Sequence, residues 1–82
     1  MIDASKPIKA SELLNELDIL HDIPQNYILV NDFSIGGTFI KLIEAINVLD
    51  EHGWEVVSIS NAPDGMTMYA LARRITKAKN QL

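Results

Sequence analysis

Gly36, Gly37 and Thr38 are the residues of this chain whose types and spacing best suit the binding of a small anion. They come directly before a segment with helical periodicity, and the free amide groups at the start of a helix favour a phosphate or a carboxylate. Neither a Gly-Lys-Ser/Thr sequence nor a Gly-x-Gly-x-x-Gly sequence accompanies them. A flexible turn followed by Thr38 as the helix N-cap explains the same three residues, and both interpretations stay open.

The side chains that serve catalysis or metal binding in other proteins are scattered here without a productive spacing. His21 and His52 are the two imidazoles, and neither has a second metal ligand at the usual helical spacing. Two carboxylate pairs fall on polar helix faces, where charged groups are ordinarily solvated: Asp18 with Asp22, and Asp50 with Glu51. The chain has no cysteine, which removes thiolate ligands and cysteine nucleophiles. We therefore expect no enzymatic activity, no metal and no cofactor.

Four basic residues gather near the end of the chain: Arg73, Arg74, Lys77 and Lys79. They form a possible patch for a nucleic acid or another anionic partner. The net charge of the whole chain is −4, however, which argues against a large phosphate footprint. Positive charge at the end of an exposed strand also discourages edge-to-edge pairing, and this simpler role remains an alternative.

The segments with strand character are apolar on both faces. Trp54 and Val56 alternate with Val57 and Ile59, whereas an antiparallel sheet with one solvated face would alternate apolar and polar residues. Because one helix covers only one face, the second face needs the N-terminal helix, a second copy of the chain or another protein as its cover. Val57 and Ile59 are the predicted self-association face.

The hydrophobic pattern predicts five elements, in the order helix, strand, helix, strand and strand, over residues 12–21, 27–33, 38–52, 54–60 and 66–74. Four leucines at spacings of three and four define the first helix, and we expect them to be packed: Leu13, Leu14, Leu17 and Leu20. Gly53 suits the left-handed position after the main helix. We expect Trp54, the next residue, to fold back on that helix and to be buried.

The segment 46–58, with Gly-Trp-Glu at residues 53–55, and the later strand ending Tyr-Ala-Leu-Ala-Arg-Arg at 69–74 carry a family resemblance. The chain resembles small bacterial and phage domains of unknown function over residues 27–75. The resemblance implies a β-α-β-β unit, with a three-stranded antiparallel sheet and one helix across it. It implies no activity, because the family has no assigned chemistry. Residues 1–26 are longer than that family needs, so the N-terminal helix is where a specificity of this protein's own could lie.

Length and composition complete the expectation. With 82 residues we expect one domain of the α+β class, with residues 1–10 and 76–82 flexible. The chain shows no apolar stretch suited to a signal peptide or a membrane span, and it lacks cysteine, so we expect a cytoplasmic protein. The predicted function is a non-enzymatic interaction module that self-associates as a homodimer. The alternatives are a small-ligand or anion-binding regulatory domain and a nucleic-acid accessory protein.

Overall fold

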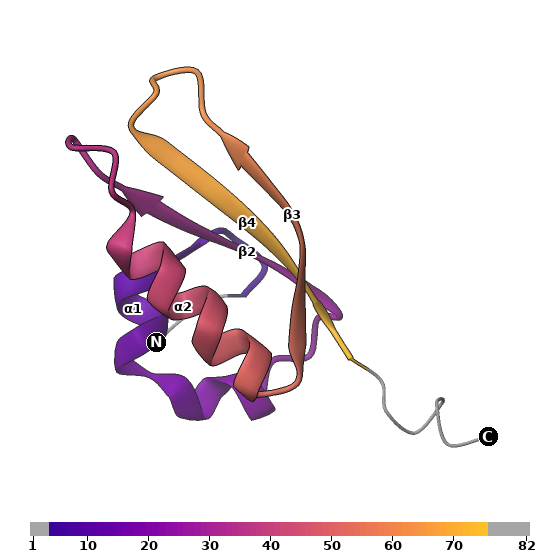
Figure 1. The fold of residues 1–82 in the computed structure, drawn as a ribbon. Coiled ribbons are helices and arrows are strands. Elements are labelled where there is room, and N and C mark those ends of the chain that lie inside the picture. The colour runs from indigo at the N-terminus through magenta and orange to yellow at the C-terminus, as the bar shows by residue number, and fades with distance from the viewer. Residues whose placement is uncertain (1–3, 76–82) are drawn as a thin grey trace.

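A four-stranded mixed sheet carries the helices on one face in the computed structural model, which describes residues 4–75 (Figure 1). The strands are β1 (Ile8–Lys9), β2 (Tyr27–Phe33), β3 (Trp54–Asn61) and β4 (Thr67–Arg74). The helices are α1 (Ala10–Asn15), the short 3₁₀ helix η1 (Leu17–His21) and the main helix α2 (Ile40–Glu51). The predicted α+β class and the order of its five main elements are confirmed.

The sheet has one strand more than predicted. The strand order is β1-β2-β4-β3, in which β4 pairs antiparallel with β2 and β3, whereas β1 runs parallel to β2. The predicted antiparallel three-stranded sheet is present, but β1 was missed because its two residues are too few to show an alternating pattern. Ile8, placed in a flexible end by the prediction, pairs with Val30 and is only 1% exposed.

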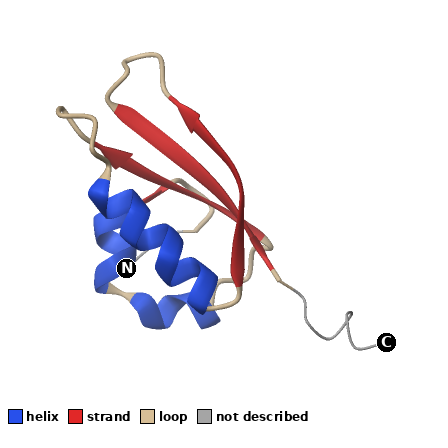
Figure 2. Cartoon of the chain, viewed as in Figure 1, coloured by secondary structure: helices blue, strands red, loops and turns tan. Residues whose placement is uncertain are grey.

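One hydrophobic core lies between the helices and the sheet. Ile28 and Val30 of β2 point into it, and the small Ala70 and Ala72 of β4 lie opposite them. The helices contribute these buried side chains: Leu13 of α1, Leu20 of η1, and Leu42, Ala45 and Leu49 of α2. All of them belong to a single cluster, so α1 and α2 lie side by side on the same face of the sheet (Figure 2). The N-terminal helix therefore leaves the other face uncovered.

The predicted helix 12–21 is divided in two. The backbone leaves the helical region at Glu16, with φ −136° and ψ 58°, between α1 and η1. Asn15 and Asp18 flank this break, and both residue types have low helix propensity. The predicted packing is nevertheless confirmed, because Leu13 and Leu20 are buried and the two leucines between them are partly buried.

Among the described residues, no helix is both long enough and apolar enough to cross a bilayer.

Trp54 is buried as predicted and belongs to the same core cluster as Leu42 and Leu49. Gly53 precedes it with φ +86°, the left-handed conformation expected after the end of α2. The indole N–H donates a hydrogen bond of 3.4 Å to the carbonyl oxygen of Leu20. This bond joins the start of β3 to η1, across more than thirty residues of chain.

The turn between β3 and β4 is held by Asp64. Its Oδ1 accepts the N–H of Met66 at 2.8 Å and the N–H of Thr67 at 3.0 Å. These bonds, that of Met66 first, lower the pKa of Asp64 because they favour the charged carboxylate. Gly65 has φ +73°, a conformation that suits glycine, and the turn joins β3 and β4 as an antiparallel hairpin.

Candidate interaction surface

We define the outer face as the side of the sheet turned away from α1 and α2. Cross-strand partners share a face, so the register assigns to it alternate residues of two central strands: Tyr27, Leu29, Asn31 and Phe33 of β2, and Thr67, Tyr69, Leu71 and Arg73 of β4. Tyr27 is 52% exposed and Phe33 58%. Residues 4–7 and the side chains of Tyr27, Leu29 and Leu71 line one pocket on this face, so this segment lies against part of it. Within residues 4–75, the remaining outer face carries aromatic rings on β2 and β4 and polar side chains on β3.

The predicted face of Val57 and Ile59 has to be corrected. The pairing of β3 with β4 shifts by one residue between Val56 and Ser58, which makes Val57 the extra residue of a β-bulge. Ser58 lies opposite Leu71 on the outer face, whereas Ile59 lies opposite Ala70 on the helix side. The prediction was wrong because it assumed that the side chains of β3 alternate strictly between the two faces of the sheet. Both residues are exposed, Val57 by 44% and Ile59 by 53%, but they do not share one face.

The outer face carries little net charge. Its charged side chains are Lys9, Glu55 and Arg73, by their register with β2 and β4. Arg73 donates a hydrogen bond to Glu55 across the strands, and this interaction raises the pKa of Arg73. The acids lie instead on or between the helices, all of them exposed: Glu12, Glu16, Asp18, Asp22, Glu44, Asp50 and Glu51. The acidic surplus therefore belongs to the helical layer.

The two arginines of the predicted basic patch have different roles. Arg74 donates hydrogen bonds to the carbonyl oxygens of Ile23 and Gln25, the latter at 3.0 Å, and its guanidinium stacks 4.5 Å from the ring centroid of Trp54. Arg74 therefore ties β4 to the segment before β2 and belongs to the fold. Arg73 is paired with Glu55, and Lys77 and Lys79 lie outside the described residues. The described part of the chain thus offers little of the predicted patch.

The glycine turn does not form the start of α2. Gly36, Gly37 and Thr38 are all exposed, and Gly37 adopts φ +76°. The N–H of Thr38 donates to Ser34 Oγ at 3.2 Å, and the N-cap position of α2 falls on Phe39, with φ +50°. The predicted role of Thr38 as the N-cap is therefore wrong. Phe39 is held in this unusual conformation while its side chain is buried in the core.

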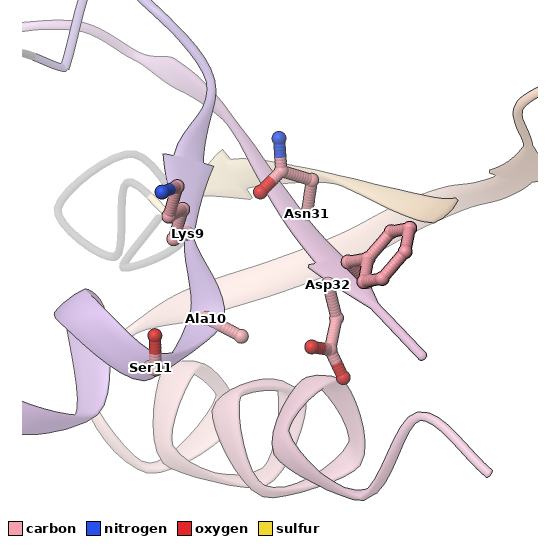
Figure 3. Close-up of a pocket in the computed structure, with 6 residues that line it drawn as sticks. Lys9, Ala10, Ser11, Asn31 and Asp32 are labelled. Carbon is pink, nitrogen blue, oxygen red and sulfur yellow. The ribbon is translucent and has the colours of Figure 1, made fainter. Parts of the chain in front are cut away.

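Asp32 of β2 supplies the cap that the glycine turn lacks. Its Oδ2 accepts the N–H of Leu42, in the first turn of α2, at 3.1 Å. Figure 3 shows the Asp32 carboxylate directed from the sheet toward α2. A carboxylate of the protein itself thus uses an amide group that an external anion would need. The anion site proposed at residues 36–38 remains untested, and this bond weighs against it.

We predict that Asp32→Ala lowers the free energy of unfolding by about 1 kcal/mol, because it removes the capping acceptor of α2. Asp32→Asn keeps a side-chain oxygen at the same place and should cost less. Urea denaturation followed by circular dichroism measures both. Equal stability of the alanine variant and the unmodified protein would contradict this role of Asp32.

His21 and His52 come together in the fold, with ring centroids 5.6 Å apart. Nδ1 of His52 lies 2.8 Å from the carbonyl oxygen of Val48, a contact with the last turn of α2. The proximity of the two rings was not predicted, because no local signal joins η1 to the end of α2. Within residues 4–75, no group of three or more ligating side chains could hold a metal ion.

No family model, curated protein or solved structure matches the chain. The resemblance to the small domains with the Gly-Trp-Glu sequence therefore stays a prediction. The β-α-β-β order that the resemblance implies is present as β2, α2, β3 and β4. The candidate site thus rests on the geometry of the outer face.

Proposed function

We propose that this protein is a non-enzymatic interaction module that self-associates through the outer face of its sheet. The observation that supports the proposal is the pair of exposed aromatic rings of Tyr27 and Phe33, with the partly buried Tyr69 beside them, on the side opposite both helices. Apolar surface of this kind on a soluble domain commonly marks an interaction site. A small chain also buries a modest share of its surface alone, so an additional interface contributes usefully to its stability.

Charge favours a second copy of the chain as the partner. Two helical layers facing each other would bring together exposed acids on both copies, which is unfavourable. Two outer faces would meet with little net charge, because Glu55 and Arg73 are paired within each copy. Two sheets that pack face to face lie about 10 Å apart. In a dimer with a two-fold axis, the same patch of each copy contacts its partner. The resulting dimer would have its sheets inside and its acidic helices outside.

The size of the face sets the expected strength of the dimer. Three strands spaced about 4.8 Å apart, each about seven residues long at about 3.3 Å per residue, span roughly 300 Å² of flat area. Counted on both copies this is roughly 600 Å² before the relief of the side chains is added, so the interface lies below the size of standard specific contacts and in the range of weak, transient ones. We therefore expect a weak dimer that forms toward high micromolar concentration and dissociates on dilution.

We predict that Leu71→Glu and Ser58→Glu shift the protein to a monomer, because each places an unpaired charge on the outer face. Ser58 is exposed and lies opposite Leu71, so its substitution leaves the core intact. Asn47→Glu is the matched control, since it adds the same charge on an exposed position of α2. Light scattering after gel filtration gives the mass, and circular dichroism shows that each variant is folded. Equal masses for the Ser58 and Asn47 variants would contradict the proposed face.

A further inference from the structure

The edge of β2 is open where β1 ends. The N–H of Ser34 donates to the carbonyl of Met66, and the N–H of Arg74 donates to the carbonyl of Asn26, so even-numbered residues of β2 bond to β4. The odd-numbered residues consequently direct their N–H and C=O groups toward β1. The pairing with β1 ends at Asn31, because the chain turns into α1 after Lys9. Phe33, the next odd-numbered residue, therefore presents its backbone groups to an open edge.

A pocket of about 210 Å³ lies at this place. Lys9, Ala10 and Ser11 line it from the end of β1 and the start of α1, and β2 contributes Asn31, Asp32 and Phe33 (Figure 3). β1 occupies the edge of β2 only as far as Lys9, because the chain turns into α1 at Ala10. An extended segment that pairs with β2 at Phe33 therefore meets the end of β1 at Lys9 and has to stop there. The pocket therefore suits the end of a chain and not a strand that passes through.

The charges in the pocket indicate which chain end fits. Lys9 is exposed, and among residues 4–75 it has no acidic partner. Asp32 keeps its negative charge, but its carboxylate is directed toward α2, where it accepts the N–H of Leu42. The hydroxyl of Ser11 and the amide of Asn31 both donate and accept hydrogen bonds, so the ammonium group of Lys9 decides the preference. A carboxylate therefore fits beside Lys9 better than an ammonium does.

We propose that this pocket binds the C-terminal carboxylate of an extended peptide from a partner protein. The peptide pairs antiparallel with β2 through the backbone of Phe33, its carboxylate lies beside Lys9, and the exposed ring of Phe33 contacts its last side chain. Strand addition at a sheet edge and capture of a terminal carboxylate are both established modes of peptide recognition. The site lies at the edge of the sheet, shares Lys9 and Phe33 with the outer face, and adds a peptide ligand to the proposed self-association.

The contact consists of backbone hydrogen bonds at one residue of β2 and one ion pair. We therefore expect a dissociation constant on the order of 0.1–1 mM. The test uses the ¹⁵N-labelled full chain and two synthetic probes: acetyl-Ala-Val-Val with a free carboxylate, and the same peptide with a C-terminal amide. The free acid should shift the amide resonances of Lys9, Asn31 and Phe33 in a saturable way. The amide should bind about ten-fold more weakly, because it lacks the charge that Lys9 recognises.

Lys9→Met should weaken binding of the free acid about ten-fold, whereas Lys6→Met, three residues earlier and also exposed, should leave it unchanged. Repeating the titration in the Ser58→Glu variant separates this site from self-association, since that substitution lies on β3 at the opposite edge of the sheet. The proposal is overturned if the acid and amide bind equally, if Lys9→Met binds as the unmodified protein does, or if no saturable shift occurs at these residues.

Discussion

Trp54→Ala is expected to lower the free energy of unfolding by about 3–5 kcal/mol, the largest effect of any single substitution considered for this chain. Trp54 is 1% exposed and is the largest fully buried side chain. Its removal leaves a cavity between β3 and the helices, the carbonyl of Leu20 loses its donor, and the guanidinium of Arg74 loses the ring beside it. A domain of this length has a total stability of roughly 4–12 kcal/mol, so the variant should unfold at a markedly lower temperature and urea concentration.

Trp54→Phe separates the volume of the side chain from its hydrogen bond. Phenylalanine keeps an aromatic ring under Arg74 but cannot donate to Leu20, and we expect a smaller loss of about 1–2 kcal/mol. Thermal and urea denaturation measure both variants, at one fixed protein concentration because the proposed self-association would add to apparent stability. A Trp54→Ala protein that melts within a few degrees of the unmodified protein would contradict the proposed role of this residue in the core.

Arg74→Met is expected to have the second largest effect, a loss of about 2–4 kcal/mol. Methionine keeps the apolar length of the side chain but removes the donors to the carbonyls of Ile23 and Gln25, and also the charge above the Trp54 ring. Those two carbonyls belong to the segment that leads into β2. Its loosening should appear as faster amide exchange at the start of β2, ahead of global unfolding.

Arg73→Met is the matched control for this substitution, because it removes the same charge one residue earlier. Arg73 is exposed and engages Glu55 across the strands on the outer face. Exposed ion pairs contribute little to stability, so the unfolding midpoint should stay nearly unchanged. Equal losses from the two substitutions would show that charge alone matters, and the assignment of Arg74 to the fold would fail.

Local pattern was sufficient for much of this fold. The apolar stripe of α2 placed that helix in the core, and Gly53 followed by Trp54 predicted both the left-handed residue and the buried ring. The strands β2 and β4 were predicted within one residue at each end. In each case the deciding signal lies within a few residues of the element itself.

Three features that the sequence did not reveal depend on distant residues or on one inserted residue. β1 exists because Ile8 pairs with Val30, more than twenty positions away, and α2 is capped by Asp32 from a neighbouring strand. The bulge at Val57 reverses the alternation of β3, and it moved the candidate face from β3 to β2 and β4. No hydrophobic pattern in the chain marks the position of that bulge.

The mass of the unmodified protein as a function of concentration tests the proposed self-association most directly. Sedimentation equilibrium from low to high micromolar concentration should give a rise from one chain of 9.1 kDa to twice that mass. The Ser58→Glu variant should stay at the mass of one chain throughout the same range. A mass of one chain for the unmodified protein at every concentration would contradict the account, since the outer face would then remain uncovered in solution.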